Sequence, residues 1–79
     1  MIKVDILTPE WSRSIEVEAI FLPGTLGEFE VLNNHAPIIS TLTGGRIKWR
    51  GPEGEDSLEI KRGVVKLRDN GMKICVEVG

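Results

Sequence analysis

Hydrophobic residues alternate with polar ones along most of the chain, and this period of two limits its fold more than any other feature. At the N-terminus, Ile2, Val4 and Ile6 are separated by charged residues. Successive side chains of a β-strand point to opposite faces, so this alternation predicts a strand with one buried face. No segment shows the 3.6-residue period that is typical of an amphipathic helix. The sequence therefore predicts an all-β fold.

Turn-forming residues separate the alternating segments. Glycine, proline and asparagine adopt backbone angles that strand interiors do not tolerate. They gather at Thr8-Pro9-Glu10, Pro23-Gly24, Asn33-Asn34, Gly44-Gly45, Gly51-Pro52-Glu53-Gly54 and Asp69-Asn70-Gly71. Of these, Asn70-Gly71 predicts a hairpin with a type I′ turn, in which both central residues have positive φ. Short antiparallel strands at this spacing are typical of a β-sandwich or small barrel.

The size of the chain allows one domain, which we expect to cover residues 1–79. A chain of 79 residues has no room for a second hydrophobic core. Its predicted core consists of hydrophobic residues at the inward positions of the strands, namely Ile15, Val17, Phe21, Phe29, Val31, Ile47, Trp49, Leu58, Ile60, Leu67, Ile74 and Val76.

Charge and cysteine content exclude several classes of function. The net charge is −2 and the sequence pI is about 5.3, so we expect no general attraction to nucleic-acid phosphates. The longest unbroken hydrophobic segment, Ala19 to Leu22, is far shorter than the roughly 20 residues that cross a bilayer. Cys75 is the only cysteine, so it has no partner for an internal disulfide. These features predict a protein of a reducing compartment.

The residues needed for catalysis do not form any recognisable motif. The single histidine, His35, stands before Ala36-Pro37, about forty positions from Cys75. One histidine and one cysteine cannot supply the three or four ligands of a zinc site. There is no nucleophile elbow, metalloprotease helix or phosphate-binding loop. We therefore expect neither enzymatic activity nor a bound cofactor or metal.

Two other functions remain open from the residues alone. Arg46, Lys48 and Arg50 share one strand face, which we interpret as a solvated outer face; the alternative is a small oligonucleotide-binding barrel. Met72-Lys73-Ile74 after the predicted turn resembles the hairpin of biotinyl and lipoyl carrier domains, with Lys73 as the modified lysine. Against this, Lys73 falls inside the predicted strand, and the second methionine of that motif is absent.

The segment from Pro23 to Ile39 carries the most informative motifs. It contains Gly24-Thr25-Leu26-Gly27-Glu28, and His35-Ala36-Pro37 begins seven residues after Glu28. The chain continues with Leu42-Thr43-Gly44-Gly45 and later Met72-Lys73-Ile74-Cys75-Val76. In this order, these motifs closely resemble the N-terminal domain of the epsilon subunit of F-type ATP synthases, and the resemblance covers the whole chain.

The resemblance implies a fold and a mechanical function. The family's domain is an antiparallel β-sandwich of about ten strands, a non-catalytic part of the central stalk that links the gamma subunit to the polar loops of the membrane c-ring. By position, Glu28, Phe29 and Glu30 are expected to contact the c-ring. His35, Ala36, Pro37 and Ile38 are expected to contact gamma.

The same resemblance implies partners and a location. Other subunits of the catalytic head are expected in the complex, with no nucleic acid. Membrane association is expected to be indirect, on the cytoplasmic face of the inner or plasma membrane.

The sequence also departs from the family pattern. Glu30 stands where a glycine is common, and Asn33-Asn34 replaces a usual Pro-Gly. Asparagine also adopts left-handed backbone angles, so we expect the turn to be kept. The family often continues into a C-terminal helical hairpin, whereas this sequence ends at Gly79. The sequence therefore corresponds to the short form that lacks this hairpin, and the resemblance gives no ground to expect inhibition of ATP hydrolysis or nucleotide binding.

Overall fold

The computed structural model describes residues 1–79 and contains nine β-strands and no helix. The strands are β1 (Ile2–Leu7), β2 (Ser12–Val17), β3 (Ala19–Gly24), β4 (Gly27–Leu32), β5 (Ile38–Leu42), β6 (Gly45–Gly51), β7 (Gly54–Ile60), β8 (Arg62–Arg68) and β9 (Gly71–Glu77). The predicted all-β class is confirmed, with nine strands in place of about ten.

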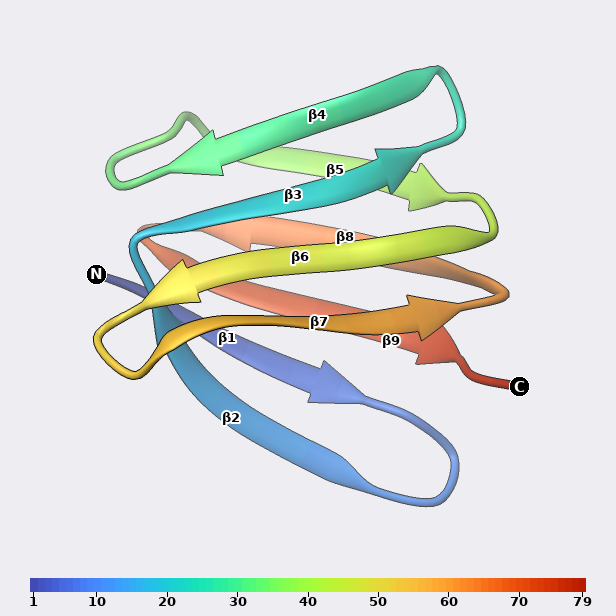
Figure 1. The fold of residues 1–79 in the computed structure, drawn as a ribbon. Helices are drawn as coiled ribbons and strands as arrows, with labels where there is room; N and C mark the ends of the chain where they lie inside the picture. The colour runs from blue at the N-terminus through green and yellow to red at the C-terminus, as the bar shows by residue number, and fades with distance from the viewer.

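The strands form one continuous sheet that folds over on itself. Its order is β2-β1-β9-β8-β5-β3-β6-β7, and β4 pairs with β3. Figure 1 shows β4, β3, β6 and β7 in front of a second layer that contains β5, β8, β9 and β1. All neighbouring strands are antiparallel except β1 and β9, which pair in parallel. This parallel pair was not predicted, because it joins the two ends of the chain.

The sheet turns from one layer to the other where β3 meets β5. Only Gly24 and Leu42 pair there, and the Thr43 N–H donates to the Pro23 carbonyl over 2.8 Å. A Cβ atom on Gly24 would lie 2.7 Å from the Gly27 carbonyl oxygen and 2.9 Å from the Phe29 ring. The corner therefore requires glycine, because no side chain fits between these atoms.

The opposite side of the molecule has a seam between strand edges. Strands β2 and β7 end the sheet and do not pair with each other. Here the Glu18 N–H donates to the Arg50 carbonyl over 2.8 Å, and a Cβ on Gly51 would lie 2.6 Å from the Glu16 carbonyl oxygen. These contacts bring the end of β2 and the bend at Glu18 against the end of β6, beside the β3–β6 ladder in which Ala19 pairs with Arg50.

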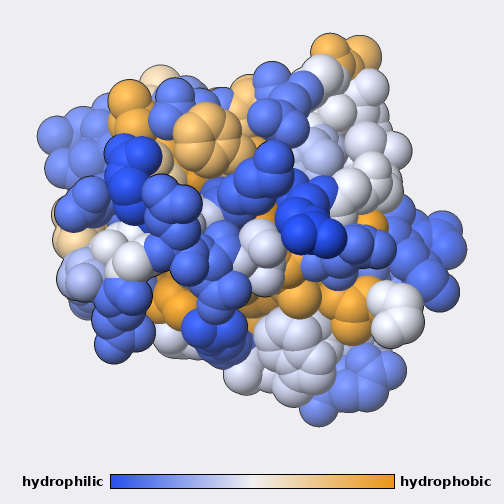
Figure 2. Space-filling model, in the orientation of Figure 1, coloured by the Kyte–Doolittle hydropathy of each residue, from blue (hydrophilic) through white to orange (hydrophobic).

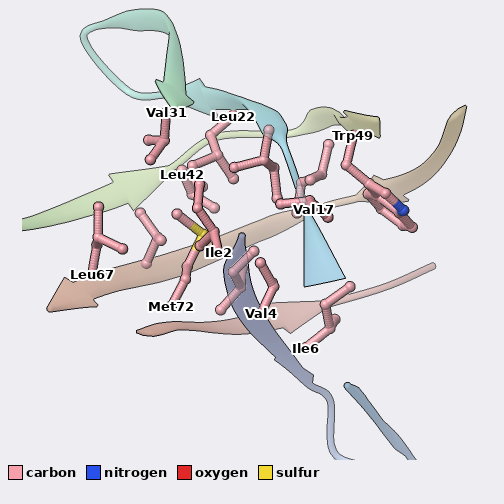
Figure 3. Close-up of a cluster of buried hydrophobic side chains, with 14 of the residues drawn as sticks. Ile2, Val4, Ile6, Val17, Leu22, Val31, Leu42, Trp49, Leu67 and Met72 are labelled. Carbon is pink, nitrogen blue, oxygen red and sulfur yellow. The ribbon is translucent and has the colours of Figure 1, made fainter. Parts of the chain in front are cut away.

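The core lies between the two layers and contains 16 buried hydrophobic residues (Figure 3). Most of the predicted core residues belong to it, namely Val17, Val31, Ile47, Trp49, Ile60, Leu67, Ile74 and Val76. Of the others, Ile15, Phe29 and Leu58 are half-buried and pack against its edge. The N-terminal residues Ile2, Val4 and Ile6 are fully enclosed, although they were not predicted as core.

The placement of Phe21 in the core was wrong. The chain bends at Glu18, and beyond the bend Ile20 and Leu22 contribute the core side chains of β3, although Ala19, Pro23 and Gly24 are buried as well. Phe21 is half-buried between Glu30 and Lys48, with which it pairs across the sheet. A one-residue shift in strand phase moves every side chain to the other face. The prediction placed Phe21 inward because it assumed that the alternation of hydrophobic and polar residues runs unbroken from β2 into β3.

The predicted hairpin between β8 and β9 is present, but its turn begins one residue earlier. Asp69 and Asn70 have φ of 51° and 59°, and Gly71 is already paired with Arg68. This register sets Leu67 opposite the buried Met72. A turn centred on Asn70-Gly71 would instead place the Asp69 carboxylate opposite Met72, where burying a charge is costly.

Candidate functional site

The residues predicted to contact the c-ring lie on β4 and divide between its two faces. Glu28 and Glu30 are exposed, and neither forms an ion pair within the chain. Phe29 points the other way, half-buried against the core, with its ring beside Gly24. The two carboxylates therefore form the free surface, while Phe29 fixes the strand that carries them.

The hairpin between β3 and β4 carries a feature that the sequence analysis missed. Leu26, at its tip, is fully exposed, with 104% of its reference surface accessible. Its neighbour Thr25 is held to Thr41 by a backbone hydrogen bond of 3.1 Å and a hydroxyl contact of 2.8 Å. The sequence did contain a signal for this exposure. Leu26 lies in a turn between a threonine and a glycine, where its side chain belongs to no strand face that packs against the core.

The residues predicted to contact gamma lie in the connection between β4 and β5. His35, Ala36 and Pro37 are exposed and outside any strand. The His35 N–H donates to the Leu32 carbonyl (3.2 Å), and its Nδ1 contacts the Ala36 carbonyl (2.7 Å). The imidazole is thus bonded to the backbone of the next residue. Ile38 is half-buried and anchors the start of β5 against the core.

The fold keeps these two groups of residues apart. The β3–β4 hairpin and the β4–β5 connection lie at opposite ends of β4 (Figure 1). At about 3.3 Å per residue, the strand separates Leu32, where the connection begins, from Glu28 by roughly 13 Å and from Glu30 by roughly 7 Å. The protein thus offers two exposed surfaces at opposite ends of the sheet.

The basic residues do not form one strip. Arg46, Lys48 and Arg50 lie on β6, whereas Arg62, Lys66 and Arg68 lie on β8 in the other layer. Several of them pair with carboxylates: Arg46 with Glu59 (3.3 Å), Arg50 with Glu18 (3.7 Å), Arg62 with Glu77 (3.1 Å) and Arg68 with Asp69 (3.7 Å). Figure 2 shows a largely hydrophilic face over the layer that contains β6. This arrangement is typical of solvated sheet faces.

The lysine considered as a carrier site lies in the middle of the sheet. Lys73 belongs to β9 and pairs with Lys66 of β8 and Asp5 of β1. A carrier lysine stands at the tip of a hairpin, but Asp69 and Asn70 occupy that tip here. The position of Lys73 therefore gives the carrier function no support.

The potentially reactive groups are dispersed. Cys75 is exposed on β9, paired with Val64 and Leu7, whereas His35 lies in the β4–β5 connection. No three histidine, cysteine, aspartate or glutamate side chains come together as a metal site. None of the structure forms a helix long and apolar enough to span a membrane.

A comparison with known protein families identifies the family of this chain. A family model described as "ATP synthase, Delta/Epsilon chain, beta-sandwich domain" matches residues 1–78. The chain belongs to this family. The resemblance inferred from the glycine corner at Gly24 and from His35-Ala36-Pro37 is therefore confirmed.

Individual relatives agree with the family. The ATP synthase epsilon chain of Leptospira interrogans is 34% identical over 79 residues, covering 99% of this chain and 62% of the relative. That of Bdellovibrio bacteriovorus is 34% identical over 80 residues, covering 96% and 57%. The chain thus spans about three-fifths of the length of these curated relatives.

Solved structures share the fold. A chain from the central stalk and c-ring of the Tetrahymena thermophila mitochondrial ATP synthase superposes with a TM-score of 0.82 at 18% identity, covering 95% of this chain and 62% of that one. A chain of the Euglena gracilis mitochondrial ATP synthase gives 0.86 at 22% identity, covering 95% and 49%. At these identities the likeness establishes the fold alone.

Proposed function

We propose that this chain is a non-catalytic subunit of the central stalk of an F-type ATP synthase, where it fastens the gamma subunit to the c-ring. The observation that carries the proposal is the family match over residues 1–78. The separation of the two exposed surfaces along β4 supports it, because a linking subunit needs contacts at two ends. The complex would hold the chain at the membrane surface on the side of the catalytic head, the cytoplasmic face in a bacterium.

The c-ring surface is assigned to the end of the β3–β4 hairpin. Glu28 and Glu30 offer two unpaired carboxylates to a cationic side chain in the polar loops, and charge-assisted hydrogen bonds are the stronger ones. Leu26 adds an exposed hydrophobic side chain beside them. Phe29 contributes indirectly, by packing the hairpin onto the core.

The gamma surface is assigned to His35, Ala36, Pro37 and Ile38. His35, Ala36 and Pro37 are exposed and Ile38 is half-buried, and Pro37 restricts the backbone, so little conformational entropy is lost on docking. A specific interface buries about 1,000 Å² in total, or about 500 Å² on each partner. The accessible surface of this chain is 4943 Å², which leaves room for both contacts.

The folded sheet suits a part that transmits torque. It holds 49 backbone hydrogen bonds within a body of 28 × 26 × 18 Å, and no buried side-chain polar atom lacks a partner. A closely packed interior deforms little under load. Rotation of the ring would therefore reach gamma with little elastic loss in this subunit.

The proposal is tested by recovering the tagged chain from its native membranes and identifying the bound proteins together with the chain's intact mass. Gamma, subunits of the catalytic head and the c-ring are expected, with the chain unmodified. A tagged variant carrying both Glu28→Lys and Ala36→Glu serves as control and should lose these partners. A modified Lys73 with carboxylase or dehydrogenase partners would overturn the proposal.

A further inference from the structure

Two turns that are distant in the sequence are bonded to each other through a pair of asparagines. The Asn34 N–H donates to Asn70 Oδ1 over 2.8 Å, and Asn70 Nδ2 donates to Asn34 Oδ1 over 3.1 Å. The residues are 36 positions apart, one in the β4–β5 connection and one in the β8–β9 turn. Both have left-handed backbone angles, with φ of 65° and 59°.

Asn70 is the fixed member of this pair. Its carbonyl accepts a 2.9 Å hydrogen bond from the Lys3 N–H at the start of β1, and β9 begins at the next residue, Gly71. Asn70 therefore joins β1, β9 and the β4–β5 connection. A glycine would meet the backbone requirement at this position equally well. The asparagine side chain adds the bonds to Asn34.

The segment that follows Asn34 has few attachments of its own. His35, Ala36 and Pro37 belong to no strand, and their hydrogen bonds stay within residues 32–36. Packing against the core resumes only at Ile38. The bonds to Asn70 are therefore the hydrogen bonds that tie the beginning of this segment to a part of the fold other than the adjoining β4.

We propose that Asn70 is a positioning residue: through its two hydrogen bonds to Asn34, it holds His35-Ala36-Pro37 in the conformation that docks on gamma. This inference rests on the proposed function for the identity of the partner. The ordering of His35-Ala36-Pro37 by Asn70 does not depend on it. Asn34 is exposed and Asn70 is half-buried, so both side chains still reach water. Their bonds compete with water, so they add little to global stability, yet they order a short segment.

The experiment uses three variants of the full chain. Asn70→Gly keeps the left-handed turn and removes both bonds. Asp69→Gly is the matched control, because Asp69 shares the turn and the positive φ but does not touch Asn34. Asn70→Asp is the conservative variant: its carboxylate accepts from the Asn34 N–H and, once the Asn34 amide turns over, from its Nδ2.

Two quantities are measured for each variant: amide hydrogen exchange at Asn34 and His35 in the isolated chain, and the Kd for gamma from the same organism. In Asn70→Gly we expect exchange to accelerate about tenfold and binding to weaken about three- to tenfold, since two neutral hydrogen bonds are lost. In Asp69→Gly and Asn70→Asp, the exchange rates and the Kd should both stay within about twofold of the parent values. Should Asn70→Gly fail to fold, Asn34→Gly, which removes one of the two bonds, replaces it.

The outcomes separate this inference from the proposed function. Unchanged exchange in Asn70→Gly, or equal acceleration in Asp69→Gly, overturns the positioning effect whatever gamma does. Faster exchange with an unchanged Kd overturns the link to docking. Failure of the parent chain to bind gamma overturns the docking role and the proposed function together, while the exchange data still decide whether Asn70 orders the segment.

Discussion

Reversing the charge of Glu28 should detach the hairpin end of the domain from the c-ring without disturbing the fold. Glu28 is exposed and forms no ion pair within the chain, so Glu28→Lys should change the free energy of unfolding by no more than about 0.5 kcal/mol. At the interface the change replaces an attraction with a repulsion. The attraction and the repulsion are each worth up to about 1 kcal/mol for an exposed pair of charges. We therefore expect the binding free energy for the c-ring to weaken by about 1–2 kcal/mol.

This loss corresponds to a five- to thirtyfold rise in Kd, by roughly 1.4 kcal/mol per factor of ten. The assay measures binding of the chain to detergent-purified c-rings at about 50 mM and about 300 mM salt, with urea unfolding as the measure of stability. The difference between parent and variant should shrink at the higher salt, because the Debye length falls from roughly 14 Å to about 6 Å.

The control is Glu53→Lys, in the turn between β6 and β7. Glu53 is also exposed and unpaired, and its reversal changes the net charge by the same amount, from −2 to 0. It lies at the other end of the sheet from the β3–β4 hairpin (Figure 1). An equal loss of affinity in both variants, or none in Glu28→Lys, would refute the assignment of this carboxylate to the c-ring contact.

Three further outcomes are expected. Gly24→Ala should lower the free energy of unfolding by about 1–3 kcal/mol in urea titration, because its Cβ meets the Gly27 carbonyl at 2.7 Å; unaltered stability would mean that the corner can relax. Ile74→Ala should destabilise the domain by about 2–5 kcal/mol and lower Tm by at least about 10 °C, whereas Ile39→Ala, at a position 74% exposed, should change Tm little. Comparable Tm shifts in these two variants would contradict the described core. Ala36→Glu should reduce the amount of gamma that co-purifies with the chain, with little change in Tm, because Ala36 is exposed. Normal recovery of gamma would show that the gamma contact does not include Ala36.

The sequence was sufficient for the properties that neighbouring residues set. The period of two identified most of the strands, and most of the glycine, proline and asparagine clusters lie at turns. Pro23 and Gly24 instead end β3, one residue before the turn, and the bend at Lys61 has no such cluster. The order of the motifs from Gly24 to Pro37 identified the family. These signals succeed because side-chain alternation and allowed backbone angles depend on a few consecutive residues. Where local order was interrupted, as at Glu18, the same reasoning misplaced Phe21.

Only the tertiary structure decided which segments meet. The parallel pairing of β1 with β9, the single Gly24–Leu42 contact at the corner and the hydrogen bonds between Asn34 and Asn70 join residues that are far apart in the chain. No local pattern encodes such contacts, because their energies depend on how the whole sheet curls to bury its core. The same curl leaves Leu26 exposed and sets the two candidate surfaces at opposite ends of β4.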